Sequence, residues 1–491
     1  MSDTHAQTEL FVRHEMIPPS EPPALETGAI KWLRENLFSG WLNTILTILG
    51  LLVVFGLARL FLPWFLHGVW NANSLGECRE IIAQTWGPDA SGACWAMIRE
   101  RWNQFMFGFY PRELYWRPVL ALLFLLVGLA PVLYSELSSK LVAAGAVIAA
   151  LIVVLAYNYG VWLPVGMLVT IAAVSAILDA RGAKWPRNLL WFSALYPAVA
   201  FWLLWGGSVW LPFVAVLGFV LGFIVMRLVS AQLGAILGAS AGAVAAVLWW
   251  SFGAGPLDEA LIGMTGTARP FWLQTVTSDQ FGGFVLAFTI GVTGIAASLP
   301  LGILLALGRR SDMPLVKVIS VGFIEFIRGV PLITLLFVAS LLLNYFLPPG
   351  TNFDIILRVI IMVTLFAAAY IAEVIRGGLA ALPRGQYEAA AALGLDYWKS
   401  MRLVILPQAL KISIPGIVST FIGLFKDTTL VVFVGLLDPL KGITDAVRAA
   451  IEWKGIYWEP YLFVGSIFFI VCFSMSRYSM YLENKLKREH R

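Results

Sequence analysis

Four neighbouring residues near the end of the chain combine charges and hydroxyl groups within an apolar run. They are Lys426, Asp427, Thr428 and Thr429. Ionisable side chains at membrane depth are costly, and they usually face a protein interior or a water-filled path. Asp427 has the charge to pair with a cationic group of a solute, and the threonines offer hydroxyls. We therefore predict a substrate path here. The alternative is a structural Lys426–Asp427 pair at a helix bend.

Two acid–base pairs occur at helical spacing in other apolar stretches. Glu325 precedes Arg328 by three positions, and Glu373 precedes Arg376 by the same interval. Residues three apart lie on one face of a helix, so each pair can form an ion pair. The first pair is followed by two residues that disfavour a continuous helix, Gly329 and Pro331. We interpret both pairs either as anchors of a gate or as structural arginines whose charged ends reach the membrane surface.

Other groupings that look catalytic or metal-binding lack the required context. The run Gly238–Gly242 matches the G-x-S-x-G hydrolase pattern, but it lies in small-residue helical sequence and not at a strand-to-helix turn. Its glycine spacing predicts a close helix-packing face. The four histidines have no metal-ligand spacing, so we predict no metal site.

The chain has three cysteines, and two of them share a hydrophilic stretch. Cys78 and Cys94 lie within 63–117, whereas Cys472 lies in an apolar run. The pair can form a disulfide if this stretch faces an oxidising compartment. Two free thiols fit the sequence equally well.

The composition requires an integral membrane protein. Of the 491 residues, 59% are hydrophobic and 13% are charged, and the mean hydropathy is +0.81. A soluble domain carries about 25% charged residues. Apolar runs of spanning length recur along the chain, which predicts an all-α fold of about 12 transmembrane helices in a lipid bilayer. The net charge of +5 belongs to loops at the membrane surface and predicts no nucleic-acid partner.

The order of apolar and basic segments predicts a topology. The spans are expected near residues 41–62, 118–134, 139–157, 162–179, 189–206, 209–227, 231–250, 283–307, 319–346, 354–379, 404–436 and 461–482. Lysines and arginines gather in the short loops 181–187 and 309–317 and at the C-terminus, which indicates the cytoplasmic side. Both termini are then cytoplasmic, with residues 1–40 as a polar tail. The longer loops 63–117 and 251–281 lie outside.

Charges are distributed unequally between the two halves. Residues 141–178 contain no Asp, Glu, Lys or Arg, and residues 189–257 contain only Arg227. The charged pairs described above all lie further along the chain. We therefore divide the membrane part into an extension, 41–280, and a functional domain, 281–485, and we expect the extension to be packed in lipid.

A polar segment, Glu388–Pro407, interrupts the apolar sequence between two predicted spans. Its composition favours a short helix over 386–403, with Gly394 as an interruption. The topology puts this helix on the cytoplasmic side. The small residues that would let another surface approach closely include Ala389 and Ala390. An ordinary amphipathic loop helix is the alternative.

The spacing in this segment resembles the EAA loop of ATP-binding cassette (ABC) importer permeases. That family's pattern reads EAA, then three residues, G, nine residues and I-x-L-P. This chain matches it with Glu388-Ala389-Ala390, Gly394 and Val404-Ile405-Leu406-Pro407, where Val404 replaces the isoleucine of the pattern. Three more segments are similar to the polar amino-acid branch of the family: Phe323–Leu336 with Val330 for Thr, Tyr370–Gly378, and Lys426–Leu430 with Thr429 for Ser. The resemblance covers 281–485, under half of the chain. The long extension resembles the larger general L-amino-acid permease subunits of Gram-negative bacteria.

The resemblance implies a five-helix permease core in the inner membrane of a bacterium. A periplasmic binding protein would deliver amino acids, and the 386–403 helix would dock as a coupling helix on a cytoplasmic ABC ATPase dimer. The docking residues would be Glu388, Ala389, Ala390, Gly394 and Pro407. A second permease subunit is expected, which makes a heterodimer. The chain contains no G-x-x-x-x-G-K-[ST] phosphate loop, so we expect no cofactor and no enzymatic activity in it, with ATP and Mg²⁺ on the partner ATPase.

Two other classes of function compete with this interpretation. A secondary active transporter of small polar solutes would need discontinuous helices in both halves, related by an internal repeat, and the unequal charge distribution disfavours that. A membrane-embedded enzyme would need convergent polar groups at one membrane depth, and the first half supplies almost none.

Overall fold

The computed structural model describes residues 28–133, 185–267, 271–342 and 354–488. Within these residues the regular structure is helical apart from two short strands, so the predicted all-α membrane fold is confirmed. The chain divides into two compact units, Met1–Ala96 and Met97–Arg491.

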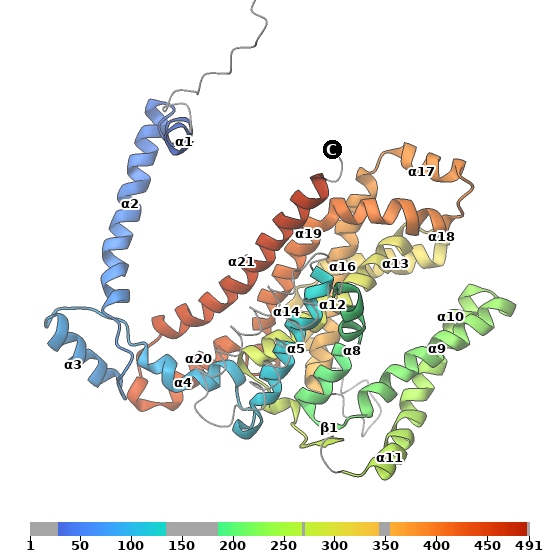
Figure 1. Cartoon of the computed structure of the whole chain (residues 1–491), viewed down its shortest axis with the longest axis horizontal. Helices are drawn as coiled ribbons and strands as arrows, with labels where there is room; N and C mark the ends of the chain where they lie inside the picture. Colours follow the sequence, from blue (N-terminus) through green and yellow to red (C-terminus); the bar gives the residue numbers. More distant parts are fainter. Residues whose placement is uncertain (1–27, 134–184, 268–270, 343–353, 489–491) are drawn as a thin grey trace, which may run out of the picture. The chain divides into compact units, whose positions relative to one another are not determined.

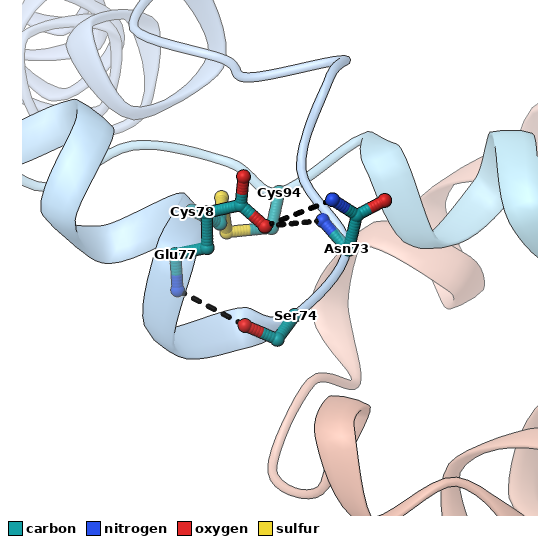
Figure 2. Close-up of a disulfide and its surroundings, with 5 residues drawn as sticks. All are labelled: Asn73, Ser74, Glu77, Cys78 and Cys94. Atoms are coloured by element: carbon teal, nitrogen blue, oxygen red, sulfur yellow. Dashed lines mark hydrogen bonds between the residues drawn. A yellow bond between two sulfur atoms is a disulfide. The ribbon is translucent and has the colours of Figure 1, made fainter.

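The first unit consists of an apolar helix followed by a small disulfide-bonded lobe. Helix α1 (Gly28–Asn36) precedes α2 (Trp41–Leu66), and α3 (Leu75–Trp86) lies in the lobe. No described residue of α2 is buried, and the helix is long and apolar enough to cross a membrane. Of the two alternatives for the cysteines, the structure has the disulfide Cys78–Cys94, with Cα atoms 6.1 Å apart (Figure 2).

Local hydrogen bonds fix the start of α3 beside this disulfide. The Ser74 hydroxyl accepts from the Glu77 amide at 3.1 Å, and the Glu77 carboxylate accepts from the Asn73 backbone amide at 2.8 Å (Figure 2). This reciprocal arrangement is a variant of the capping box. A crosslink across a loop of this length stabilises the folded lobe by about 3 kcal/mol, because it restricts the unfolded chain.

The second unit begins with the extension helices and continues into the C-terminal helices (Figure 1). The extension contains α4 (Ala96–Phe107), α5 (Trp116–Leu133), α8 (Trp185–Trp205), α9 (Leu211–Leu233), α10 (Ala235–Leu248) and α11 (Ala254–Thr265). The C-terminal part contains α12 (Gly283–Arg309), α13 (Pro314–Gly329), α14 (Leu332–Phe337), α16 (Ile355–Ala381), α17 (Arg384–Ala392), α18 (Tyr397–Ser400), α19 (Leu406–Asp427), α20 (Pro439–Ala449) and α21 (Trp458–Arg488). Strands β1 (Gly207–Ser208) and β2 (Trp272–Leu273) pair antiparallel.

Seven helices in the described residues are long and apolar enough to cross a membrane, or eight if one bent pair is a single span. They coincide with predicted spans in both halves. The spans predicted at 139–157 and 162–179 lie outside the described residues. The chain is therefore a multi-span membrane protein.

Three predicted boundaries differ from the structure. The span expected at 319–346 is broken between α13 and α14 by a bend of 103°. Val330 has extended backbone there because it precedes Pro331, which disfavours a helical conformation in the residue before it. The span expected at 404–436 begins earlier, at Tyr397, and contains a π-helical turn. The loop expected at 251–281 is helical as far as Thr265.

Two helices of the extension, α5 and α8, pack against the C-terminal helices, which corrects for them our expectation that the extension lies in lipid. Helices α9 and α10 instead keep many apolar side chains exposed, as that expectation requires. A single core joins apolar residues of both parts, among them Leu120, Leu204, Leu286, Leu332 and Ile356. Polar contacts reinforce it, since the Tyr110 hydroxyl donates to Leu204 O at 2.7 Å and the Trp453 indole donates to Glu100 Oε2 at 2.6 Å. The expectation failed because an apolar helix that faces protein has the same composition as one that faces lipid.

Small residues bring the C-terminal helices into close contact. A methyl group on Gly302 of α12 would lie 2.6 Å from the Ile371 side chain of α16. One on Gly378 of α16 would lie 2.6 Å from Ala409 O of α19. Helices α12, α16 and α19 therefore form one tightly packed group. In Figure 1, α17 and α18 lie at one end of this group and α20 lies at the other.

Candidate functional site

The polar segment predicted from the sequence forms a corner of two short helices, which we call the α17–α18 corner (residues 384–400). Helix α17 ends at Ala392, and Gly394, two residues later, has a φ of +68°, which is strained for other residues. The Leu395 amide bonds Ala390 O and the Gly394 amide bonds Ala391 O, which is a Schellman motif. Asp396 then caps α18 by accepting from the Lys399 amide at 2.8 Å. The turn residues thus set the angle between the two helices.

The exposed surface of this corner is apolar at two prominent positions. The Leu393 side chain is 76% exposed and that of Trp398 is 68% exposed. Glu388, Ala389 and Ala391 are also exposed. Ala390, in contrast, is 1% exposed because it packs against the chain itself. Two exposed anchors beside small residues are typical of a surface that another protein covers.

Pro407 lies in the first turn of α19. It directly follows the π-helical turn Met401–Ile405, through which α18 continues into α19 as one helix from Tyr397. The predicted docking residues are therefore distributed over the corner and the start of the next span.

A cluster of five charged side chains joins the ends of α12, α13 and α16. Glu373 accepts from Arg376 at 2.8 Å and lies 3.4 Å from Arg309 and 3.7 Å from Arg328. Arg309 also donates to Glu325 at 2.9 Å. Helical spacing predicted an ion pair between Glu373 and Arg376, which the structure has. Glu325 pairs with Arg309 of α12 instead of Arg328.

Two features surround this charge cluster. The guanidinium of Arg328 lies 5.7 Å from the centre of the Tyr370 ring, which is a cation–π distance. Gly329 and Pro331 lie at the bend that follows α13, so the bend and the cluster are adjacent in sequence. The arrangement can hold three helix ends together, and it can release them if the charges separate.

The four residues proposed to line a substrate path lie where α19 ends. The helix gives way to a 3-10 segment, Thr428–Val434. The hydroxyl of Thr428 donates to Phe425 O at 2.8 Å, and that of Thr429 donates to Lys426 O at 2.9 Å. Both hydroxyls keep lone pairs that can accept a hydrogen bond. Lys426 and Asp427 make no ion pair with each other among the described contacts.

Spacing did not identify four further residues in or near the α17–α18 corner. Arg310, at the end of α12, donates to the Tyr387 hydroxyl of α17 at 2.8 Å. Gln408 of α19 donates to the Gln386 side chain at 2.9 Å. These partners are far apart in the chain, so only the helix packing brings them together. Among the described residues, no group of three or more His, Cys, Asp or Glu side chains could hold a metal ion.

Comparisons with known proteins agree on one family. The family model described as "Binding-protein-dependent transport system inner membrane component" matches residues 298–488. A Rhodobacter capsulatus protein named "Glutamate/glutamine/aspartate/asparagine transport system permease protein BztC" is 58% identical over the full length of both chains. The Escherichia coli "Inner membrane amino-acid ABC transporter permease protein YhdY" is 37% identical over 97% of this chain and 98% of its own. A crystal structure described as an amino acid ABC transporter with histidines is 28% identical, with a TM-score of 0.37, over 41% of this chain and 91% of that one.

Proposed function

The chain belongs to the permease subunits of amino-acid ABC importers, and from this premise we propose that it imports amino acids through ATP hydrolysis by a partner ATPase docked at the α17–α18 corner. The observation that carries the proposal is the exposed apolar surface of that corner, Leu393 and Trp398, within a segment of the family's EAA spacing. ATP and Mg²⁺ would bind the partner, since no phosphate-loop pattern occurs in this chain.

The remaining partners follow from the same premise. The chain would pair with a second permease subunit and receive substrate from a periplasmic binding protein. Both termini would lie on the cytoplasmic side of the inner membrane, and the disulfide-bonded lobe would lie on the periplasmic side. The disulfide supports this orientation, because such bonds persist in the periplasm and are rare in the cytosol.

The substrate would be a polar amino acid. The 58% identical relative is named for glutamate, glutamine, aspartate and asparagine, which supports this class. Asp427 would pair with the ammonium group, and the partly exposed Thr429 hydroxyl would accept from it, whereas Thr428 is fully buried and would help to hold this end of α19 in place. The charge cluster of Glu325, Arg328, Glu373 and Arg376, with Gly329 and Pro331 at the bend, would hold the inner end of the path closed.

Two cysteine variants test the docking surface. Ala391→Cys is exposed and should crosslink to the ATPase in the assembled complex, whereas Ala390→Cys is buried and should not. Equal crosslinking of both variants, or of neither, would contradict docking at this face.

The substrate path has its own test. Asp427→Lys should abolish amino-acid uptake by the reconstituted importer, because it places a second cation where the ammonium group is expected. Crosslinking of Ala391→Cys should persist in this background, which would show that the complex still assembles. Normal uptake by Asp427→Lys would rule Asp427 out as a substrate contact.

A further inference from the structure

Helix α12 ends in two adjacent arginines that bind different parts of the molecule. Arg309 reaches into the charge cluster, where it lies 2.9 Å from Glu325 and 3.4 Å from Glu373. Arg310 reaches the α17–α18 corner, where it donates to Tyr387. One helix end therefore connects the exposed corner to the charge cluster.

The Tyr387 side chain is bonded to two membrane helices at once. Its hydroxyl accepts from Arg310 of α12 at 2.8 Å and donates to Leu379 O of α16 at 3.2 Å. The Arg310 guanidinium also lies 5.4 Å from the centre of the Tyr387 ring. The ring is half-buried against the apolar cluster that α12, α16 and α19 share. Tyr387 is thus held by packing and by hydrogen bonds on both sides.

The third helix of the group is bonded to α17 by the neighbouring residue. Gln386 accepts from Gln408 of α19 at 2.9 Å. Because α12, α16 and α19 contact one another closely at Gly302 and Gly378, these helices have little room to move independently. Helix α17 is connected to α16 and α19 by short stretches of chain, whereas its described link to α12 is the contact between Tyr387 and Arg310.

We infer that Tyr387 is the positioning residue that transmits movement of α17 to α12, with the Arg310–Tyr387 contact as the joint. Arg309 then carries the movement to Glu373 and Glu325. This inference rests on the proposed function, since it takes α17 as the element that the ATPase moves. It assigns to Tyr387 a role in coupling that is separate from binding the ATPase, because its hydroxyl faces the chain's own helices.

The experiment measures ATP hydrolysed per amino acid imported by the complete importer in proteoliposomes. Tyr387→Phe keeps the ring but loses both hydrogen bonds, and Arg310→Gln loses the charge. Each should raise the ratio of ATP hydrolysed to amino acid imported about fivefold, the equivalent of ~1 kcal/mol for one hydrogen bond. Arg310→Lys keeps a cationic donor and should restore part of the coupling. Tyr461→Phe is the matched control, since Tyr461 is exposed in α21, away from the corner, and no described hydrogen bond involves its hydroxyl.

The double variant Arg310→Gln with Tyr387→Phe should be no worse than either single variant, because both break the same joint. Crosslinking of Ala391→Cys to the ATPase should be unchanged in all of them. A ratio equal to wild type in Tyr387→Phe would overturn the inference. If that variant does not assemble, the ratio measured for Arg310→Gln decides in the same way. Failure of Ala391→Cys to crosslink in the otherwise unaltered chain, or failure of the wild-type importer to couple ATP to uptake, would instead contradict the proposed function.

Discussion

At the scale of residues, Glu373 is the shared acceptor of three arginines. They come from the ends of α12 and α13 and from α16 itself. A single exposed ion pair contributes little, but one carboxylate that serves three guanidinium groups loses several contacts together when it is removed. Its side chain is 23% exposed, compared with 54% for Glu325, which pairs with Arg309 alone. Neutralising Glu373 should therefore lower the free energy of unfolding more than neutralising Glu325.

Glu373→Gln should lower the free energy of unfolding by about 2 kcal/mol, because it removes the carboxylate that pairs with Arg328 and Arg376 and leaves Arg309 with Glu325 only. Glu325→Gln is the matched control and should cost less than about 1 kcal/mol. Thermal unfolding of the detergent-solubilised protein measures both. Equal losses in the two variants would mean that Glu373 has no special place in the cluster.

Asp438 is a second residue whose environment has a measurable effect, here on how stability depends on pH. It is buried and caps α20, and its carboxylate accepts from the Leu440 and Lys441 amides. Burial raises the pKa of Asp438 to about 6, although those amides and the Lys441 charge favour the ionised form. Between its ordinary pKa near 4 and about 6, the folded state holds a proton that the unfolded state has released, so stability falls as the pH rises through this window.

Asp438→Asn keeps the N-cap but cannot ionise, so it should remove that fall in stability between pH 4 and 6. The measurement is the unfolding midpoint of both proteins across the window. Asp438→Ala should also be flat with pH but less stable by about 1 kcal/mol, because it loses the cap. A difference in midpoint between wild type and Asp438→Asn that stays constant across the window would contradict the raised pKa.

Spacing along the chain could predict local contacts of the candidate site but not distant ones. Glu373 and Arg376 are three residues apart in one helix, so their contact follows from helical geometry. Arg309 is 64 residues from Glu373, and Arg310 is 77 residues from Tyr387. Only the packing of α12 against α16 brings these partners together, and no local pattern encodes it.

At the scale of elements, the turn between α17 and α18 depends on Gly394. An alanine there would carry a Cβ at a φ of +68°, which costs about 1 kcal/mol or more and favours a different turn. Gly385, in the first turn of α17, has no positive φ, and no atom lies within 4 Å of the position of an added methyl group. The two glycines therefore make a matched pair.

Gly394→Ala should reduce ATP-driven uptake strongly, because it alters the angle between α17 and α18 at the docking surface. Gly385→Ala should be neutral or slightly stabilising, since alanine favours a helix over glycine. Uptake and crosslinking of Ala391→Cys are measured for both. Full activity of Gly394→Ala would show that the corner tolerates another geometry.

Apolar runs predicted the spans well because lipid requires long apolar helices. Breaks within them were harder to predict. Trp249–Gly253 forms a π-helical turn that continues into α11, where a loop was expected from residue 251. Likewise, Pro331 was evident in the sequence, but a bend of 103° depends on what α13 packs against.

At the scale of the whole molecule, the orientation in the membrane is open to direct measurement. An impermeant maleimide should label Asp89→Cys on intact spheroplasts, whereas Ala391→Cys should react only after permeabilisation. The background should be low, because Cys78 and Cys94 are bridged and Cys472 is buried. The reverse pattern of labelling would invert the proposed topology.

The whole-molecule packing also limited what the sequence could reveal of the extension. The core that joins Leu120 and Leu204 to Leu286 depends on contacts between residues far apart in the chain. Hydropathy records only that these side chains avoid water, and both lipid and protein satisfy that requirement.

The central claim is that this chain carries amino acids through a path driven by a separate ATPase. Uptake of labelled glutamate into proteoliposomes that contain the chain, its permease partner, the ATPase and the binding protein tests it most directly. The account predicts uptake that requires internal ATP and the binding protein and that persists when an ionophore abolishes the proton gradient. Uptake driven by the gradient without the ATPase would contradict it and would favour a secondary transporter.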